Sequence, residues 1–282
     1  MRIETTGAGG PTVRSTTLFG FKPAEALKDI ADGWALWRIW LNLSWQEFRG
    51  TYRRSALGIF WVVLSFAGFV GVKLFIFSSL LHDTEPGYYD AYLLTGFFVW
   101  MFLSQSTTAA PQVFVSARGW IKSEALPFSL YIYKDILREF YNLILTSSVV
   151  IVAIMLIGFQ VKVTTPYSLL AVMFFLVNAF FYKLLLGIIG ARIRDVGHLV
   201  RAVMMPMLFL TPIFWQPDQM GGAMKYLWWN PFFHYLEIFR APILDGHFPV
   251  TSWIFSLSVL ALTMLASLVL FARYRQRIVF WL

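Results

Sequence analysis

The chain has 282 residues, of which 58% are hydrophobic and only 13% are charged, and it contains no cysteine. Soluble domains carry about 25% charged residues, so this composition, with a mean hydropathy of +0.65, excludes an ordinary soluble protein. It predicts an all-α protein embedded in a membrane. A disulfide framework and a thiolate metal site are excluded because cysteine is absent. The net charge of +8 is compatible with nucleic acid or a membrane surface as a partner, and the positions of the charges decide between them.

The first 22 residues are polar and rich in Gly and Thr. They have no apolar stretch followed by a small-residue cleavage site, so we expect a flexible cytoplasmic N-terminus and no signal peptide.

Residues 23–55 predict an amphipathic helix that lies on the membrane surface. Pro23 suits a first helical turn, and apolar residues recur at steps of three and four. The stripe consists of Ile30, Trp34, Trp37, Leu41, Trp45, Phe48 and Tyr52. Trp-rich stripes with basic flanks are typical of the membrane–water interface. Packing on a soluble partner is an alternative that the pattern leaves open.

Residues 56–282 contain six segments that approach the length and polarity of a membrane-spanning helix. They are 57–81, 89–113, 132–159, 167–189, 199–215 and 251–272. The fifth is short and contains Pro206 and Pro212, so we expect it to be kinked or broken.

The Lys and Arg residues fall mainly before the first span, after the second and fourth spans, and in the tail. The opposite loops hold only Lys162, Lys225 and Arg240. This bias predicts that both termini are cytoplasmic. The basic excess is therefore a topology signal, and we do not expect nucleic-acid binding.

The stretch between the fifth and sixth spans is too interrupted to cross the membrane. Asn230-Pro231 reads as an N-cap followed by a first-turn proline, and Gly221-Gly222 and Asp245-Gly246 bracket two short apolar half-helices. We expect a re-entrant segment that dips into the membrane and returns. An aromatic loop resting on lipid headgroups is the alternative.

Motifs of enzyme chemistry are absent from the sequence. There is no GxxxxGK[ST] sequence for ATP binding, no HExxH and no GxSxG. The four histidines are far apart, and we expect no metal site. Two lysines, Lys73 and Lys183, lie inside predicted spans, where an ionisable side chain marks a transport pathway or a structural partner. Lys73 is near enough to the outer end to reach the interface.

Three motifs resemble one family. RGTYRRSALGIFWVVL at 49–64, RDVGHLVRAVMMPMLFLTPIFW at 194–215 and NPFFHYLEIFRAPIL at 230–244 resemble type-2 ABC exporter permeases, in particular the branch that exports O-antigen, capsule and teichoic acid. Ser65-Phe66 departs from the Asn-Pro pair usual in that family, which leaves the local bend of the first span open.

The resemblance implies a six-span homodimer that works with two copies of a separate P-loop ATPase, which binds ATP and Mg²⁺, so that this chain holds no cofactor. It implies a channel between the two protomers and a polysaccharide substrate on a lipid carrier such as undecaprenyl diphosphate, in the bacterial inner membrane. A type-2 permease for a small hydrophobic drug is the alternative. A membrane-embedded glycosyl or acyl transferase would need clustered acids or histidines, which are not seen.

Two sets of residues follow as site predictions. A short helix over 116–125, ended by Pro127, would dock in a cleft of the ATPase through Arg118, Trp120, Lys122 and Glu124; an ordinary basic loop is the alternative. Aromatic side chains around the Asn230-Pro231 break would close the outer exit of the channel. These gate residues are Trp228, Trp229, Asn230, Phe232, Phe233 and Tyr235.

Overall fold

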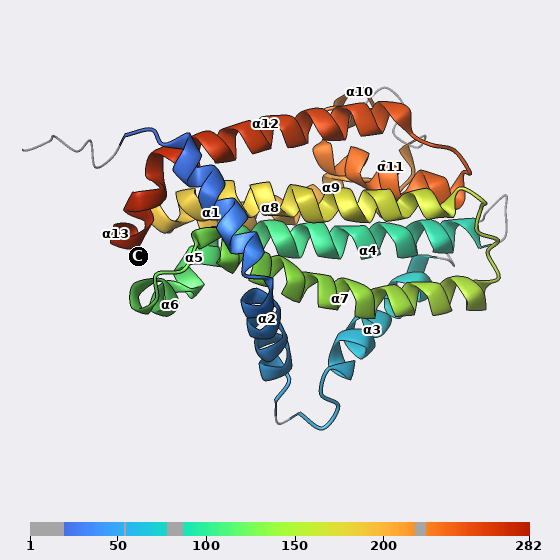
Figure 1. The fold of residues 1–282 in the computed structure, drawn as a ribbon. Coiled ribbons are helices and arrows are strands. Elements are labelled where there is room, and N and C mark those ends of the chain that lie inside the picture. Colours follow the sequence, from blue (N-terminus) through green and yellow to red (C-terminus); the bar gives the residue numbers. More distant parts are fainter. Residues whose placement is uncertain (1–19, 54, 78–86, 218–223) are drawn as a thin grey trace, which may run out of the picture.

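A computed structural model of the chain describes residues 20–53, 55–77, 87–217 and 224–282, and the fold is given for these residues. The described part is all helical, and its long helices lie side by side in a bundle (Figure 1). The prediction of an all-α membrane protein is confirmed. Three helical segments are long and apolar enough to cross a membrane, namely Phe128–Ile157, Thr165–Arg192 and Val250–Trp281.

The centre of the bundle consists of four long helices that are rich in apolar residues. They are α4 (Tyr88–Ala109), α7 (Phe128–Ile157), α8 (Ser168–Arg192) and α12 (Val250–Tyr274). α8 packs against α12, α7 and α4, and α4 packs against α7. Helices that are apolar on all faces bury one face against their neighbours and offer the others to lipid.

Two shorter apolar helices correspond to the first and fifth predicted spans. α3 (Phe60–Phe77) packs on α7 and α4, and residues 78–81 of its predicted span lie outside the described residues. α9 (Val196–Leu210) contains Pro206 and ends where Thr211 adopts an extended conformation before Pro212. The residue before a proline disfavours helical geometry, so the predicted break of the fifth segment is confirmed.

The segment 23–55, predicted as one helix, forms two helices. α1 (Pro23–Ala35) and α2 (Trp37–Thr51) are separated at Leu36, whose φ of −82° and ψ of 33° depart from helical values. α1 crosses the bundle and packs on both α7 and α12 (Figure 1). α2 packs mainly on α7. The close contact at Gly33, where a Cβ would lie 2.1 Å from Ser129 Oγ, lets α1 approach the start of α7.

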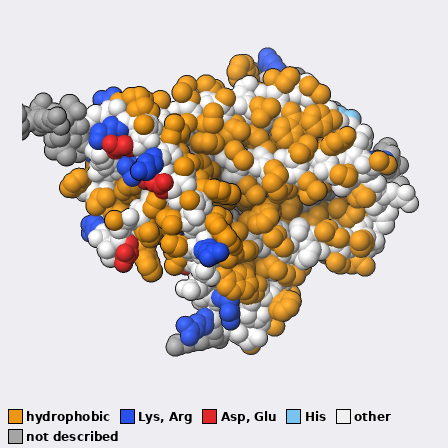
Figure 2. Space-filling model, in the orientation of Figure 1, with side chains coloured by type: hydrophobic (Ala, Val, Ile, Leu, Met, Phe, Trp, Pro, Cys, Tyr) orange, Lys and Arg blue, Asp and Glu red, His pale blue; other side chains and the backbone are white. Residues whose placement is uncertain are grey.

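Short helices occupy the two ends of the bundle. One end carries η1 (Ala110–Gln112), α5 (Val113–Ser116), α6 (Arg118–Ser123), η4 (Arg275–Arg277) and α13 (Ile278–Trp281). The other end carries η2 (Thr165–Tyr167), α10 (Met224–Leu227) and α11 (Pro231–Leu244). Figure 2 shows most of the charged side chains of this face at the α1 and α6 end and near the α2–α3 connection, while hydrophobic side chains predominate over the rest. We name the two ends after α6 and α11.

Candidate functional site

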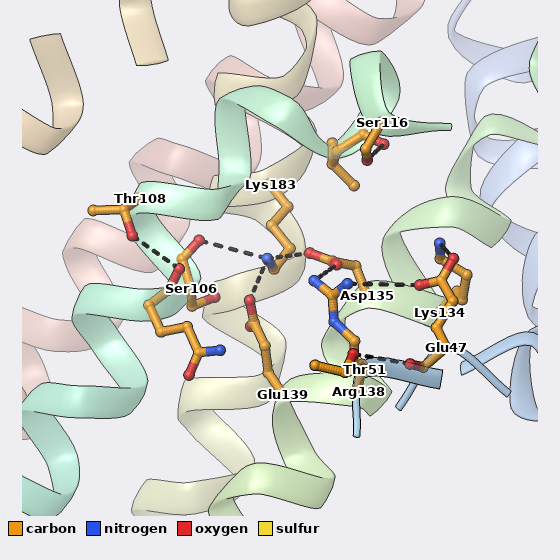
Figure 3. A network of polar contacts seen from close by, with 12 residues as sticks. Glu47, Thr51, Ser106, Thr108, Ser116, Lys134, Asp135, Arg138, Glu139 and Lys183 are labelled. Atoms are coloured by element: carbon orange, nitrogen blue, oxygen red, sulfur yellow. Dashed lines mark hydrogen bonds and ion pairs between the residues drawn. The ribbon is translucent and has the colours of Figure 1, made fainter. Parts of the chain in front are cut away.

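A buried ion cluster surrounds Lys183 of α8 (Figure 3). Its side chain is 0% exposed, and Nζ donates to Asp135 Oδ2 at 2.6 Å and to Glu139 Oε1 at 2.8 Å, both on α7. The carbonyl of Ser106 on α4 lies 3.5 Å from the same nitrogen. Asp135 is seven residues from the start of α7, or about 10 Å along the helix, so the cluster lies inside the bundle.

The cluster continues to the surface and ties α2 to α7. Arg138 bonds Asp135, Lys134 bonds Glu47 of α2, and Arg138 Nη1 lies 3.6 Å from Glu47 Oε2. The cluster in Figure 3 has three cations, Lys134, Arg138 and Lys183, and three anions, Glu47, Asp135 and Glu139. Its net charge is therefore zero. A charge in a medium of low dielectric constant is tolerated when it is paired in this way.

The sequence left two roles open for Lys183, a transport pathway and a structural partner. The structure shows a structural partner, because Lys183 forms ion pairs between α8 and α7. Its partners Asp135 and Glu139 were not predicted from the sequence, because the positive-inside rule concerns only Lys and Arg. Their spacing of four residues places both carboxylates on one face of a helix. That spacing within an apolar span was the signal that could have found them.

Lys73 of α3 is half-buried and is placed differently. Its Nζ lies 5.6 Å from the ring centroid of Phe69 and 5.7 Å from that of Phe214, which follows α9. These cation–π contacts connect α3 with the segment after α9, and they place Lys73 apart from the ion cluster.

The predicted coupling residues form an exposed group at the α6 end. The side chains of Arg118, Trp120, Lys122 and Glu124 are exposed, whereas Ile121 is buried beneath them. The helix is shorter than predicted, because α6 starts at Arg118 and is separated from α5 by Ala117. Ile121 therefore anchors α6 to the bundle while its polar side chains point outward.

Arg118 also lines a cavity of about 360 Å³ with residues from three other segments. Its other lining residues are Gln112, Val115, Ala191, Arg194, His198, Trp281 and Leu282. The exposed surface of this end is therefore basic around α6.

Asp29 of α1 holds the connection from α6 to α7 in place. Its carboxylate accepts hydrogen bonds from the backbone N–H groups of Phe128 at 3.2 Å and Ser129 at 3.0 Å, and therefore caps the start of α7. Arg275 Nε donates to the same carboxylate at 2.7 Å. On the exposed side of α1, the Lys22 ammonium, 2.7 Å away, lowers the pKa of Glu25 below its ordinary value.

At the α11 end, the predicted gate residues do not form one surface. Trp229 is 80% exposed and Trp228 is 43% exposed. Phe233 and Tyr235, in contrast, are buried, Phe233 beside Trp228 and Tyr235 against Phe174 and Phe175. Phe232 is partly buried against Trp100. α11 packs among α4, α8 and α12, so the rings of Phe233 and Tyr235 lie inside the protomer, and their assignment to a channel exit stays a prediction.

Asn230 has the capping geometry predicted for it. Its side-chain oxygen accepts from Phe232 N at 3.0 Å. Its Nδ2 donates to Leu210 O at 3.2 Å and to Thr211 Oγ1 at 3.1 Å, at the end of α9. Asn230 therefore both starts α11 and fastens it to α9.

Replacing Asn230 with leucine is expected to destabilise the protein by about 2 kcal/mol, since an N-cap contributes about 1 kcal/mol and the two further hydrogen bonds add to it. The measurement is thermal unfolding of the purified protein. Replacing the exposed neighbour Trp229 with alanine is the matched control and is expected to leave the unfolding temperature unchanged. Equal unfolding temperatures for Asn230→Leu and the unaltered chain would contradict this role.

Arg240 of α11 is a buried charge outside the Lys183 cluster, although the sequence placed it only among the cations of the outer loops. Its guanidinium lies 3.7 Å from the ring centroid of Tyr92, and Nη1 donates to the carbonyl of Pro212 at 3.0 Å. A Cβ at Gly96 would lie 2.2 Å from its Nη2, so α4 needs glycine there. These contacts lock α11 to α4 and to the segment that follows α9.

In the described residues, no group of three or more His, Asp or Glu side chains is placed to hold a metal ion.

The comparisons with known proteins agree with the helical membrane architecture. The family model described as "ABC-2 type transporter" matches residues 39–244. Two proteins of Klebsiella pneumoniae, each named O-antigen export system permease protein RfbA, are 22% and 21% identical over 205 residues. Each match covers 71% of this chain and 78% of the relative.

The chain belongs to the ABC-2 type transporter family, whose members are the membrane subunits of transporters that work with an ATPase subunit. It is therefore a transport subunit and not itself an enzyme. The family and the three apolar helices identify it as a protein of the bacterial inner membrane.

Proposed function

We propose that this chain is the permease subunit of an exporter that moves a polysaccharide, linked to a lipid carrier such as undecaprenyl diphosphate, across the inner membrane. The observation that carries the proposal is the similarity to two O-antigen export permeases along most of both chains. The three motifs that resemble this branch lie within or at the edges of α3, α9 and α11.

A separate ATPase supplies the energy in this proposal, and ATP and Mg²⁺ bind to that subunit. The exposed polar side chains of α6 support a docking role, because they stand on a helix that Ile121 anchors and Asp29 braces through the start of α7. Movement of an ATPase cleft around α6 would then pass directly into α7.

The proposed membrane arrangement has six spans, with α1 and α2 at the cytoplasmic interface and α10 and α11 as a re-entrant segment. The charged α6 end supports a cytoplasmic position for both termini. The left-handed Gly246, with φ of 72°, turns the chain back after α11. We infer a homodimer from the resemblance to export permeases; exposed apolar side chains such as Phe60 and Phe75 on α3 and Met205 and Phe209 on α9 can face a second protomer or lipid.

This arrangement predicts the side on which each loop lies. Reporter fusions after residue 125 and after residue 195 are expected to read cytoplasmic, and a fusion at 163, where Val163 is exposed between α7 and α8, is expected to read external. The physical reason is the retention of Lys- and Arg-rich loops on the cytoplasmic side. An external reading at 195 would overturn the six-span arrangement.

Deletion of the gene tests the substrate. We expect lipid-linked polymer to accumulate inside the cell, and surface polysaccharide to be lost, with no change in sensitivity to hydrophobic drugs. Restoration of surface polysaccharide by the intact chain is the control. A change in drug sensitivity without polymer accumulation would instead identify the small-molecule permease considered above.

A further inference from the structure

The cavity of about 360 Å³ that Arg118 lines lies at the α6 end of the bundle. Besides α6, its lining comes from the η1–α5 segment, the corner between α8 and α9, and α13. Figure 1 shows α6 and α13 at one extreme of the bundle, at the opposite end from α11. A protein that covers α6 would therefore meet this cavity as well.

The arginines of this cavity are available to a ligand. Arg118, Arg194 and His198 are exposed and line the space together. Among the described residues, neither Arg118 nor Arg194 has an ion-pair partner. Arg201 adds a further positive charge, with its Nη2 3.3 Å from His198 Nδ1. Leu282 also lines the cavity, but its carboxylate is not within ion-pair distance of a described cation. The cavity therefore carries an excess of positive charge.

Close contacts hold the walls of this cavity in place. A Cβ at Gly197, in the first turn of α9, would lie 2.9 Å from Gln112 Nε2, and Gly190 of α8 approaches η1 even more closely. The corner between α8 and α9 therefore packs directly on η1. On the other wall, the Arg192 guanidinium lies 5.7 Å from the ring centroid of Trp281, which connects α13 to α8. A site whose walls are already arranged binds its ligand at a lower entropic cost.

The chemistry of the lining selects an anion, and its position selects the source of that anion. A guanidinium group donates two parallel N–H bonds to a carboxylate or a phosphate. Arg118 belongs both to this cavity and to the exposed group of α6 side chains that we expect to dock on the ATPase. Asp and Glu are mostly exposed on protein surfaces, so a protein seated on α6 offers carboxylates at this point.

We propose that this cavity receives an acidic side chain of the partner ATPase, whose carboxylate pairs with Arg118 and Arg194. The proposal rests on the proposed function and adds to it a contact outside α6, because Arg194 immediately precedes Asp195, the N-cap of α9. Movement of the ATPase would then pass into α9 as well as into α7. The phosphate of a membrane lipid shares this chemistry and is the competing ligand.

Carbodiimide coupling tests directly for a carboxylate in the cavity. Arg194→Lys retains the positive charge and places an amine there, and the reagent joins an amine to a carboxylate in contact with it, forming an amide and leaving as a urea. Arg273→Lys, exposed at the same end but outside the cavity, is the matched control.

The coupling is carried out on the complex of the chain with its ATPase, and the links are mapped by mass spectrometry. We expect a peptide of the ATPase joined through Asp or Glu to position 194, and none joined to position 273. No link at position 194, equal links at both positions, or a link at 194 to a phospholipid alone would overturn the proposal.

Charge reversal measures what the pair contributes to binding. Because Arg194 is exposed and has no ion pair among the described residues, Arg194→Glu is expected to leave thermal stability unchanged. We expect it to weaken binding of the ATPase about tenfold, which corresponds to roughly 1.4 kcal/mol, while Arg273→Glu binds normally. Replacing the mapped acidic residue of the ATPase with lysine should restore binding to Arg194→Glu. Unchanged binding by Arg194→Glu, or no restoration by the second change, would contradict the pairing.

These results are separable from those that test the proposed function. The gene deletion tests polymer export, and co-purification of the unaltered chain tests its partnership with an ATPase. A chain that exports polymer and co-purifies with the ATPase but gives no link at position 194 contradicts the cavity alone, whereas a chain that binds no ATPase contradicts the proposed function.

Discussion

Replacing Lys183 with methionine is expected to destabilise the protein by about 3–5 kcal/mol, which is the usual loss when one partner of a buried ion pair is removed. Lys183 is fully buried, and its removal leaves Asp135 and Glu139 as two carboxylates facing the same space. Like charges in a medium of low dielectric constant repel strongly. The measurement is thermal unfolding of the purified protein, together with its steady-state level in the membrane.

A double variant makes this prediction specific to the charge. Asp135 retains Arg138 as a partner when Lys183 is lost, whereas Lys183 is the cation bonded to Glu139. Lys183→Met combined with Glu139→Gln is therefore expected to regain part of the lost stability. Lys225→Met, at an exposed position on α10, is the control and is expected to be neutral. A double variant no more stable than Lys183→Met would contradict the ion-pair explanation.

Reversing two charges on α6, Arg118→Glu with Lys122→Glu, is expected to abolish export and to uncouple ATP hydrolysis by the partner from transport. Both side chains are exposed and make no contribution to the packing around Ile121. The fold should therefore be preserved while two attractive charges in the docking surface become repulsive. Loss of one partner of a buried, hydrogen-bonded charge pair in an interface costs about 2–5 kcal/mol, which is more than tenfold in binding, and a cleft that encloses α6 would bury its charges in this way.

Surface polysaccharide, membrane level and co-purification with the ATPase are the three measurements for this variant. Arg273→Glu, an exposed charge at the same end but on α12, is the matched control and should leave all three unchanged. Normal export by the α6 double variant would remove α6 as the coupling helix.

Features that are determined by residues close together in the sequence could be predicted from the sequence. The Asn230-Pro231 pair predicted the cap that starts α11, and the proline pair predicted the end of α9, because both effects are set by the backbone within a few residues. The break at Leu36 was not predicted, and it lies three residues after Gly33, where α1 closes on Ser129 of α7. A contact between segments about 100 residues apart leaves no local pattern.

The candidate sites divide in the same way. A lysine within an apolar span indicates that a partner exists, but its identity depends on how α7 and α8 are rotated against each other. α11 is apolar on nearly every face, so its sequence does not show which rings turn inward. Tyr235 therefore lies among Phe174 and Phe175, although its position beside the Asn-Pro break suggested an exit gate. The exposure of Arg118, Lys122 and Glu124 was predictable because charged side chains are almost never fully buried unless they are paired, whereas the burial of Ile121 was not predicted.

The contacts of Asp29 impose an order on the synthesis of the protomer. Its carboxylate binds Arg275, which the ribosome adds 246 residues later, and the N–H of Lys22 bonds the carbonyl of Ala272. The first helix of the nascent chain therefore cannot reach its final site until the last membrane helix has been made. Contacts between positions so far apart in the sequence are slow to form, although the entropic cost of closing the loop grows only slowly with its length. Until then the start of α7 lacks the Arg275-braced cap, so chains truncated within α12 should be recognised by the cell as unfinished at the α6 end.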